Sequence, residues 1–242
     1  MSPAATSPAR SFARALGTAL LDLVYAPRCA ACGEALGSTA GEPFCALCAD
    51  AVEPVPGGCA RCGLPGPDPV CGACLADPPP FRSCHAAALL GGPVADAIHA
   101  LKYRDRPALA RPLGTWLAAR VPVPPGAAIV PVPLARGRRR DRGYDQAALV
   151  ARWLARSLDR RPSLLRGAVV RTRETPHQVG RTRAERLAGV RGAFRAGPIV
   201  RGREVVLVDD VVTTGATAAA CAEAVLVAGA RSVAVVALAR AD

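Results

Sequence analysis

Lysine is almost absent from this 242-residue chain, in which all but one of the 31 basic residues are arginine. The single lysine, Lys102, is followed by tyrosine, so the chain has no Gly-Lys-Ser/Thr loop of the kind that binds nucleotide phosphates. It also lacks a Gly-x-Gly-x-x-Gly fingerprint after a strand, a Gly-x-Ser-x-Gly turn and a His-Glu-x-x-His motif. These absences exclude the usual signatures of ATPases, dehydrogenases, serine hydrolases and metalloproteases.

Long apolar runs are missing as well. No uncharged apolar stretch reaches about 18 residues, the length that spans a bilayer. Residues 11–25 carry apolar side chains at helical spacing, but Arg14 and Asp22 interrupt them, which favours an amphipathic docking helix over a signal peptide. We therefore predict a tail and amphipathic helix over residues 1–25 of a cytoplasmic protein without a membrane span.

Aromatic residues are scarce at 4%, yet the hydrophobic share of 51% is enough to fill a core. The net charge is +12, and the uniform preference for arginine over lysine is partly a matter of coding composition. Excess arginine nevertheless suits phosphate-rich ligands, because a guanidinium pairs with them through two hydrogen bonds. Two interpretations stay open: contact with nucleic acid, and a solvated or phosphate-facing surface.

Cysteine, in contrast, is abundant, and eight of the ten cysteines form four Cys-x-x-Cys pairs. The pairs are Cys29/Cys32, Cys45/Cys48, Cys59/Cys62 and Cys71/Cys74. They make an internal repeat, since Cys-x-x-Cys-Gly occurs at residues 29–33 and again at 59–63, each time followed by a second pair. Each half therefore offers four thiolates, the number that a closed structural zinc site takes.

Disulfides and iron–sulfur ligation are the alternatives for these cysteines. Disulfides are disfavoured because no secretion signal is present and a two-residue spacing strains the bridge, whereas an iron–sulfur cluster also uses four cysteines. The segment is rich in glycine and proline and poor in apolar residues, so it needs a metal to fold. We predict a double zinc ribbon over residues 26–78 that holds one or two structural Zn²⁺ ions.

Beyond this module, strands and helices alternate. Apolar runs predict strands at residues 86–90, 128–132, 168–171, 205–208 and 232–238. Helical patterns fall at residues 94–102, 108–120, 144–160 and 218–226. Such alternation predicts an α/β domain over residues 84–242, built on a mostly parallel sheet flanked by helices.

The most informative stretch is residues 205–217, Val-Val-Leu-Val-Asp-Asp-Val-Val-Thr-Thr-Gly-Ala-Thr. A buried strand leads to two carboxylates, then to a loop of small residues that opens into a helix. A helix N-terminus with free N–H groups favours a phosphate, and the adjacent carboxylates suit ribose hydroxyls or Mg²⁺. We predict a ribose-5-phosphate grip made of Asp209, Asp210, Thr213, Thr214, Gly215, Ala216 and Thr217.

Two arginine-rich segments extend this prediction. The first, residues 136–143, is expected to be a basic loop directly after a strand, where open α/β sheets bind ligands, so Arg138 and Arg142 are candidates for phosphate contact. A solvated basic turn is the alternative. The second, residues 172–197, is long and polar, which is typical of a lid or binding loop.

Residues 205–217 resemble, along their whole length, the phosphoribosyl-pyrophosphate signature of type I phosphoribosyltransferases. The four Cys-x-x-Cys pairs, Leu-Lys-Tyr-Arg at residues 101–104, Arg-Gly-Tyr-Asp-Gln-Ala at 142–147 and Thr-Pro-His-Gln at 175–178 resemble the ComF family, over roughly residues 20–240. The family often has asparagine where this chain has Asp145 and Gly189.

The resemblance implies a type I phosphoribosyltransferase fold behind a zinc-binding module, and a phosphoribosyl pyrophosphate site that works with Mg²⁺. It also implies that residues 172–194 form the flexible loop over the substrate. The site residues assigned to this loop are Gln178, Arg181, Arg183 and Arg186.

By the same resemblance, the partners would be phosphoribosyl pyrophosphate or a nucleotide, and also single-stranded DNA or competence and helicase proteins. Two functions remain: a phosphoribosyltransferase acting on a nitrogenous base, and a non-catalytic DNA-uptake or regulatory protein that uses the pocket as a sensor.

Overall fold

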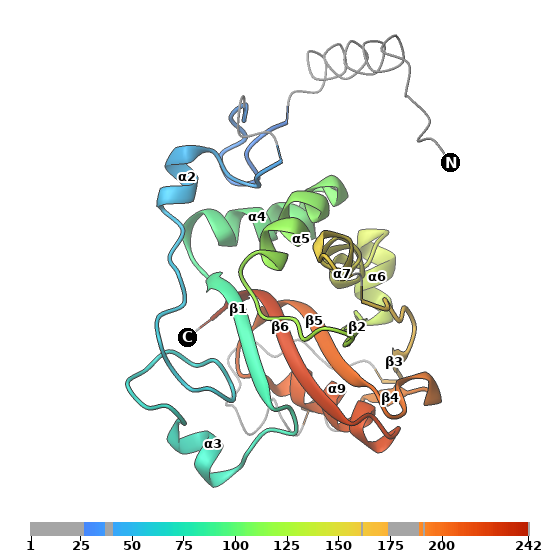
Figure 1. Ribbon diagram of the computed structural model, residues 1–242. Coiled ribbons are helices and arrows are strands. Elements are labelled where there is room, and N and C mark those ends of the chain that lie inside the picture. The colour runs from blue at the N-terminus through green and yellow to red at the C-terminus, as the bar shows by residue number, and fades with distance from the viewer. Residues whose placement is uncertain (1–26, 37–40, 161, 174–188, 191, 242) are drawn as a thin grey trace, which may run out of the picture.

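The computed structural model describes residues 27–36, 41–160, 162–173, 189–190 and 192–241, and its centre is a four-stranded sheet (Figure 1). The strands lie in the order β1-β6-β5-β2, and every neighbouring pair is parallel. Their bounds are β1 Ser83–Leu89, β2 Ala128–Pro131, β5 Glu204–Val212 and β6 Ser232–Arg240. The predicted parallel α/β sheet is thereby confirmed.

Alternating side chains of β5 divide the interior into two cores. Val206 and Val208 pack with the helices of one face, whereas Val205 and Leu207 pack with the elements of the other. This follows from the two-residue period of a strand, and both faces are buried because helices cover a parallel sheet on both sides.

Three helices cover the first face: α4 Gly92–Tyr103, α5 Ala110–Ala118 and α7 Gln146–Ser157. Helices α5 and α7 approach each other closely at Gly114. A Cβ atom at this position would lie 2.6 Å from the Cβ of Trp153 and 2.8 Å from the carbonyl oxygen of Val150. Only glycine fits this helix contact without displacing backbone.

The second face is covered by α9 Ala216–Val227 and by a small antiparallel sheet of β3 Val169–Arg171 and β4 Phe194–Ala196. Helix α9 ends as expected, with Gly229 just beyond it at φ +94°. The antiparallel pairing of β3 was not foreseen from the sequence. Short 3₁₀ turns occur at Pro107–Leu109 and Pro198–Val200.

The two halves of the cysteine module pack on opposite faces of the sheet. The first half, which includes α2 Ala46–Asp50, joins the core of α4, α5 and α7, where the rings of Phe44 and Trp116 meet edge to face at 5.6 Å. The second half, which includes α3 Gly72–Ala76, joins the α9 core through Phe81. In Figure 1, α2 lies near α4 and α3 lies beyond the opposite end of β1.

The segment between the two halves runs along the exposed side of β1. The backbone N–H of Leu89 donates to the carbonyl oxygen of Glu53 at 2.9 Å. The edge of the sheet is therefore partly covered by the chain that links the two cysteine clusters, which protects it from pairing with other molecules.

Three local predictions were wrong in extent or type. Strand β5 continues through the acidic pair to Val212, because β6 pairs with it as far as Arg240. The basic segment expected as a loop is a helix, α6 Arg136–Arg142, closed by Gly143 at φ +73°. Helix α9 starts at Ala216, two residues earlier than expected.

The predicted N-terminal helix within residues 1–25 lies outside the described residues. Along the described part of the chain, no helix has the length and apolar character needed to cross a bilayer.

Candidate functional site

A cavity of about 510 Å³ opens at the carboxyl ends of β2 and β5. It brings together the residues that the sequence singled out from two separate segments. The segment after β5 contributes Asp209, Asp210, Thr213, Thr214, Gly215, Ala216 and Thr217, and α6 contributes Arg138 and Arg142. The site therefore lies where parallel α/β sheets bind ligands, with its acidic and basic residues facing one space.

Backbone geometry shapes the small-residue loop at the start of α9. Gly215 has φ +75° and forms the N-cap of the helix, a conformation that a residue with a side chain adopts only with strain. The hydroxyl oxygen of Thr214 accepts a hydrogen bond from the N–H of Ala216 at 3.4 Å. The loop thus presents small side chains and a helix N-terminus to the cavity, which favours an anion.

A buried arginine donates hydrogen bonds to the backbone of this loop. The guanidinium of Arg240, at the end of β6, donates to the carbonyl oxygens of Val212 and Thr213. Arg240 is only 4% exposed, and its Nε has no hydrogen-bond partner among the described residues. The charge of Arg240 therefore lies just beneath the predicted phosphate position.

The two adjacent carboxylates have different environments. Asp209 is partly exposed to the cavity, and burial together with the neighbouring Asp210 carboxylate raises its pKa to about 7. Asp210 is buried, and both of its oxygens have partners: Oδ1 lies 2.7 Å from Nζ of Lys102, and Oδ2 accepts from Nε2 of Gln146 at 2.8 Å. Asp209, in contrast, lines the cavity without an ion pair to any residue that the structure describes.

The basic wall of the cavity comes from α6. The guanidinium carbon of Arg142 lies 4.7 Å from the ring centroid of Tyr103, and its Nη1 is buried without a partner in the described structure. Oε1 of Gln146 is likewise buried without a hydrogen-bond partner among the described residues. Buried polar groups without partners are costly, so these atoms need a polar partner, which water or a ligand in the cavity can supply.

Lys102, Gln146, Arg240 and His99 were not assigned to the site from the sequence. His99 is exposed and lines the cavity, with its ring centroid 4.9 Å from that of Tyr103. For Lys102 a signal existed, since it is the only lysine. Asp145, where the family often has asparagine, caps α7 by accepting from the N–H of Ala148 at 3.0 Å.

The predicted flexible-loop residues Gln178, Arg181, Arg183 and Arg186 lie outside the described residues. Arg171 and Val190, which lie before and after that segment, both line the cavity.

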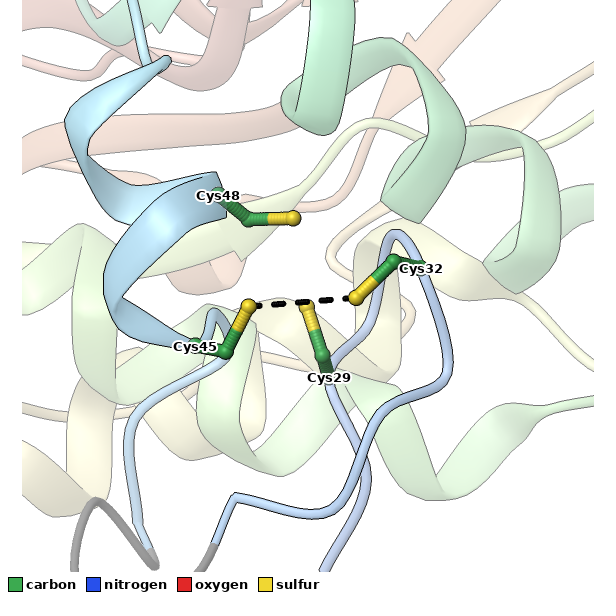
Figure 2. Close-up of side chains that lie close together, drawn as sticks. All are labelled: Cys29, Cys32, Cys45 and Cys48. Carbon is green, nitrogen blue, oxygen red and sulfur yellow. Dashed lines mark hydrogen bonds between the residues drawn. The ribbon is translucent and has the colours of Figure 1, made fainter.

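The eight paired cysteines form two clusters, Cys29/Cys32/Cys45/Cys48 and Cys59/Cys62/Cys71/Cys74, each with its four sulfur atoms within 4.8 Å of one another. Figure 2 shows the first cluster, in which the four side chains point toward a common centre. The Sγ atoms of Cys32 and Cys45 are 3.8 Å apart, and those of Cys62 and Cys71 are 3.7 Å apart. Sulfurs bound tetrahedrally to zinc at about 2.3 Å are separated by about 3.8 Å, so this donor set fits Zn²⁺.

Backbone N–H groups lower the pKa of one cysteine in each cluster. Burial alone would raise the pKa of Cys29, but N–H groups of Cys45, Cys32 and Ala31 donate to its sulfur and lower the pKa to about 6. At the equivalent Cys59, burial and backbone hydrogen bonds oppose each other in the same way, and the pKa is also lowered to about 6. The thiolate is the form that binds metal, so both loops favour ligation. The lone Cys84 and Cys221 are buried, as packing residues are.

Comparisons with known proteins find matches in two parts of the chain. A phosphoribosyl transferase domain model matches residues 145–242, and a double zinc ribbon domain model matches residues 20–86. DNA utilization protein YhgH of Escherichia coli (strain K12) is 36% identical over 197 residues, which cover 75% of this chain and 83% of that protein. The chain belongs to the ComF family. The match to a double zinc ribbon and the two four-cysteine clusters support structural Zn²⁺ in this module.

Other relatives of this ComF protein carry similar names. DNA utilization protein YhgH of Salmonella typhi is 34% identical over 197 residues, covering 75% of this chain and 83% of its own. Competence protein F of Haemophilus influenzae is 41% identical over 93 residues, or 37% of this chain and 40% of that protein.

Among solved structures, the glutamine phosphoribosylpyrophosphate amidotransferase from B. subtilis is 25% identical, with a TM-score of 0.36, over 58% of this chain. The structure of the allosteric regulatory enzyme of purine biosynthesis is also 25% identical, with a TM-score of 0.36, over 52% of this chain. The ComF chain spans 27% and 24% of their respective lengths.

Proposed function

We propose that this ComF protein binds phosphoribosyl pyrophosphate together with Mg²⁺ and transfers the phosphoribosyl group to a nitrogenous base. The observation that carries the proposal is the cavity itself, in which a small-residue loop at a helix N-terminus, the partly exposed carboxylate of Asp209 and the arginines of α6 converge. These three chemistries match the 5-phosphate, the ribose hydroxyls and the pyrophosphate of one ligand. A volume of about 510 Å³ is adequate for a ligand of this size.

Each element has a distinct role in this proposal. The N-terminus of α9, with Thr213 to Thr217 around it, holds the 5-phosphate through backbone N–H groups and hydroxyls. Asp209 accepts from the ribose hydroxyls, with Asp210 behind it as a buried partner of Lys102. Arg138 and Arg142 pair with the pyrophosphate through their guanidinium groups.

The reaction breaks the bond from C1 of the ribose to the pyrophosphate oxygen and forms a bond from C1 to the nitrogen of the base. The nitrogen supplies the electron pair, the pyrophosphate leaves with the other pair, and the transition state resembles an oxocarbenium ion. Bound Mg²⁺ supplies charge neutralisation to the pyrophosphate. The protein residues contribute positioning and electrostatic stabilisation, so no protein nucleophile is required.

Titration calorimetry with phosphoribosyl pyrophosphate and Mg²⁺ is the test. We expect saturable binding to the native chain and a loss of about tenfold or more in affinity in Asp209→Asn, because the neutral amide is a weaker acceptor for ribose hydroxyls. Since the pKa of Asp209 is about 7, the affinity should rise more from pH 6 to pH 8 in the native chain than in the variant, in which the ligand phosphates still titrate. Asp159→Asn, which neutralises an exposed carboxylate beyond α7, is the matched control.

Absence of binding to the native chain, or equal binding by Asp209→Asn, contradicts the proposal. If the native chain binds phosphoribosyl pyrophosphate, the accepting base is identified by offering nucleobases with the labelled compound and measuring the release of pyrophosphate.

A second candidate function is binding of single-stranded DNA, and an arginine cluster on α5 and α7 favours it. The guanidinium carbons of Arg111, Arg152 and Arg156 lie 5.3, 5.9 and 5.1 Å from the ring centroid of Trp153. Arg152 and Arg156 also line, with Arg166, an open groove of about 390 Å³. Guanidinium groups interleaved with an aromatic ring are suited to phosphates and stacked bases. The relatives named for DNA utilization and competence are consistent with this function.

Fluorescence anisotropy with a labelled single-stranded oligonucleotide tests this second function. Each phosphate contact on a single strand contributes about 0.7 to the slope of log affinity against log salt, so Arg152→Ala/Arg156→Ala should lower that slope by about 1.4. Arg231→Ala, which removes an exposed arginine before β6, should leave the slope unchanged. Salt-insensitive binding, or equal slopes in both variants, argues against a role for this cluster.

A further inference from the structure

Lys102 stands out in a protein whose other basic residues are all arginine. It lies in the last turn of α4, where its side chain lines the cavity beside Asp210. At exposed positions an arginine supplies the same charge as a lysine. At a confined position the two differ, because the ammonium is compact with three donors, whereas the guanidinium is a wide planar fork with five.

The surroundings of Lys102 leave part of its ammonium group available. Its Nζ is 2.7 Å from Oδ1 of Asp210, and no other side-chain or backbone partner occurs among the described residues. The Lys102 side chain is 18% exposed, compared with 7% for Asp210. One N–H satisfies the buried carboxylate, and the other two can donate to a ligand.

The position of Lys102 is between the acidic and the basic parts of the site. It lines the main cavity and also an adjoining cavity of about 730 Å³, and Arg138 and Arg142 line both of these cavities as well. A single ammonium group here can contact Asp210 and a ligand held by the α6 arginines at the same time.

We propose that Lys102 contacts the pyrophosphate group of the substrate while it remains paired with Asp210. The inference rests on the proposed function, and it assigns to Lys102 the role of stabilising the negative charge of the departing pyrophosphate. A guanidinium at this position would pair with both oxygens of Asp210 and displace Gln146 from Oδ2, where its amide now donates at 2.8 Å. A lysine binds one oxygen only, so it preserves the Gln146 contact and keeps donors for the substrate.

The test compares two ligands that differ only in the pyrophosphate group. Lys102→Gln keeps a donor for Asp210 but loses the charge. We expect it to bind phosphoribosyl pyrophosphate about 10- to 100-fold more weakly than the native chain, the range for a lost hydrogen bond to a charged group, and ribose 5-phosphate within about threefold of it. Lys102→Arg should also bind phosphoribosyl pyrophosphate more weakly than the native chain. Equal weakening of both ligands by Lys102→Gln, or full affinity in Lys102→Arg, overturns the inference.

A second measurement uses the native chain and needs no variant. Lys102 is the only lysine in the sequence, so acetylation by acetic anhydride gives a single lysine product that mass spectrometry can follow. Phosphoribosyl pyrophosphate with Mg²⁺ should slow acetylation of Lys102 at least about fivefold more than ribose 5-phosphate does, because blocked access reduces the reactive amine in proportion to occupancy. Equal acetylation with both ligands overturns the inference. If calorimetry detects no binding of phosphoribosyl pyrophosphate to the native chain, the proposed function itself fails.

Discussion

Removal of zinc from the second cysteine cluster is expected to destabilise the protein by more than about 4 kcal/mol, the range reached when a structural metal is lost. Cys59→Ser removes a buried ligand, and the binding free energy of a structural metal is part of the folding free energy of the segment that holds it. At about 2–4 °C per kcal/mol for a chain of this size, the melting temperature should fall by about 10 °C. Thermal unfolding followed by circular dichroism, with metal analysis of the same samples, measures both quantities.

The second cluster should also affect the substrate site, because a cavity of about 280 Å³ is lined by Cys62 and Phe81 on one side and by Thr214 and Gly215 on the other. The Phe81 ring comes within 3.8 Å of the position that a Cβ of Gly215 would occupy. Cys59→Ser should therefore weaken binding of phosphoribosyl pyrophosphate. Cys32→Ser, which removes the exposed ligand of the first cluster, should weaken it less.

Cys221→Ala is the control for these variants, since it removes a buried cysteine outside both clusters. It should retain two zinc ions per chain. A chain that loses its zinc to a chelator without any change in melting temperature would show that the clusters do not support the fold.

Gly114→Ala is expected to lower the free energy of unfolding by about 3 kcal/mol, the upper range for inserting one methyl group into a packed interior. The added Cβ would meet the Cβ of Trp153 at 2.6 Å and the carbonyl oxygen of Val150 at 2.8 Å, both on α7. Because the obstacle includes backbone, α5 and α7 must separate to make room. Urea unfolding should show a lower midpoint with an unchanged slope.

Gly72→Ala is its matched control, since Gly72 is also helical and a Cβ there has no neighbour within 4 Å. Alanine has the higher helix propensity, so this variant should be neutral or slightly more stable than the native chain. Similar losses in both variants would contradict the close contact between α5 and α7.

The sequence predicted the sheet well because its strands are apolar on both faces. It could not predict that β5 includes Asp209 and Asp210, since two carboxylates disfavour a strand locally. The pairing of Asp209 with Ala237 and of Val212 with Arg240 overrides that preference. Helix α6 was not predictable either. It consists of arginines with one glycine and one aspartate, so no apolar periodicity predicts a helix there.

For the candidate site, local motifs predicted the loop before α9 and the basic segment, and the structure places both in one cavity. The network beneath the site was not predictable, because Lys102, Gln146 and Asp210 come from three elements that are distant in sequence. The role of Arg240 was not predictable either, since nothing in the sequence of the final strand indicates that its side chain contacts the loop after β5. The grouping of eight cysteines into two clusters of four was predictable, because their spacing in the sequence is local.

The strand order has a consequence for how the protein is made. Strand β6 lies between β1 and β5, so the register that pairs Ser83 with Ala234 can form only after the ribosome has synthesised almost all of the described chain. The two zinc modules emerge much earlier, and their short-range ligands allow them to take up metal at once. During translation they would already be folded when β1 meets its partner, which reduces the length of disordered chain that must search for a long-range contact. Zinc supply during synthesis should therefore govern the yield of folded protein.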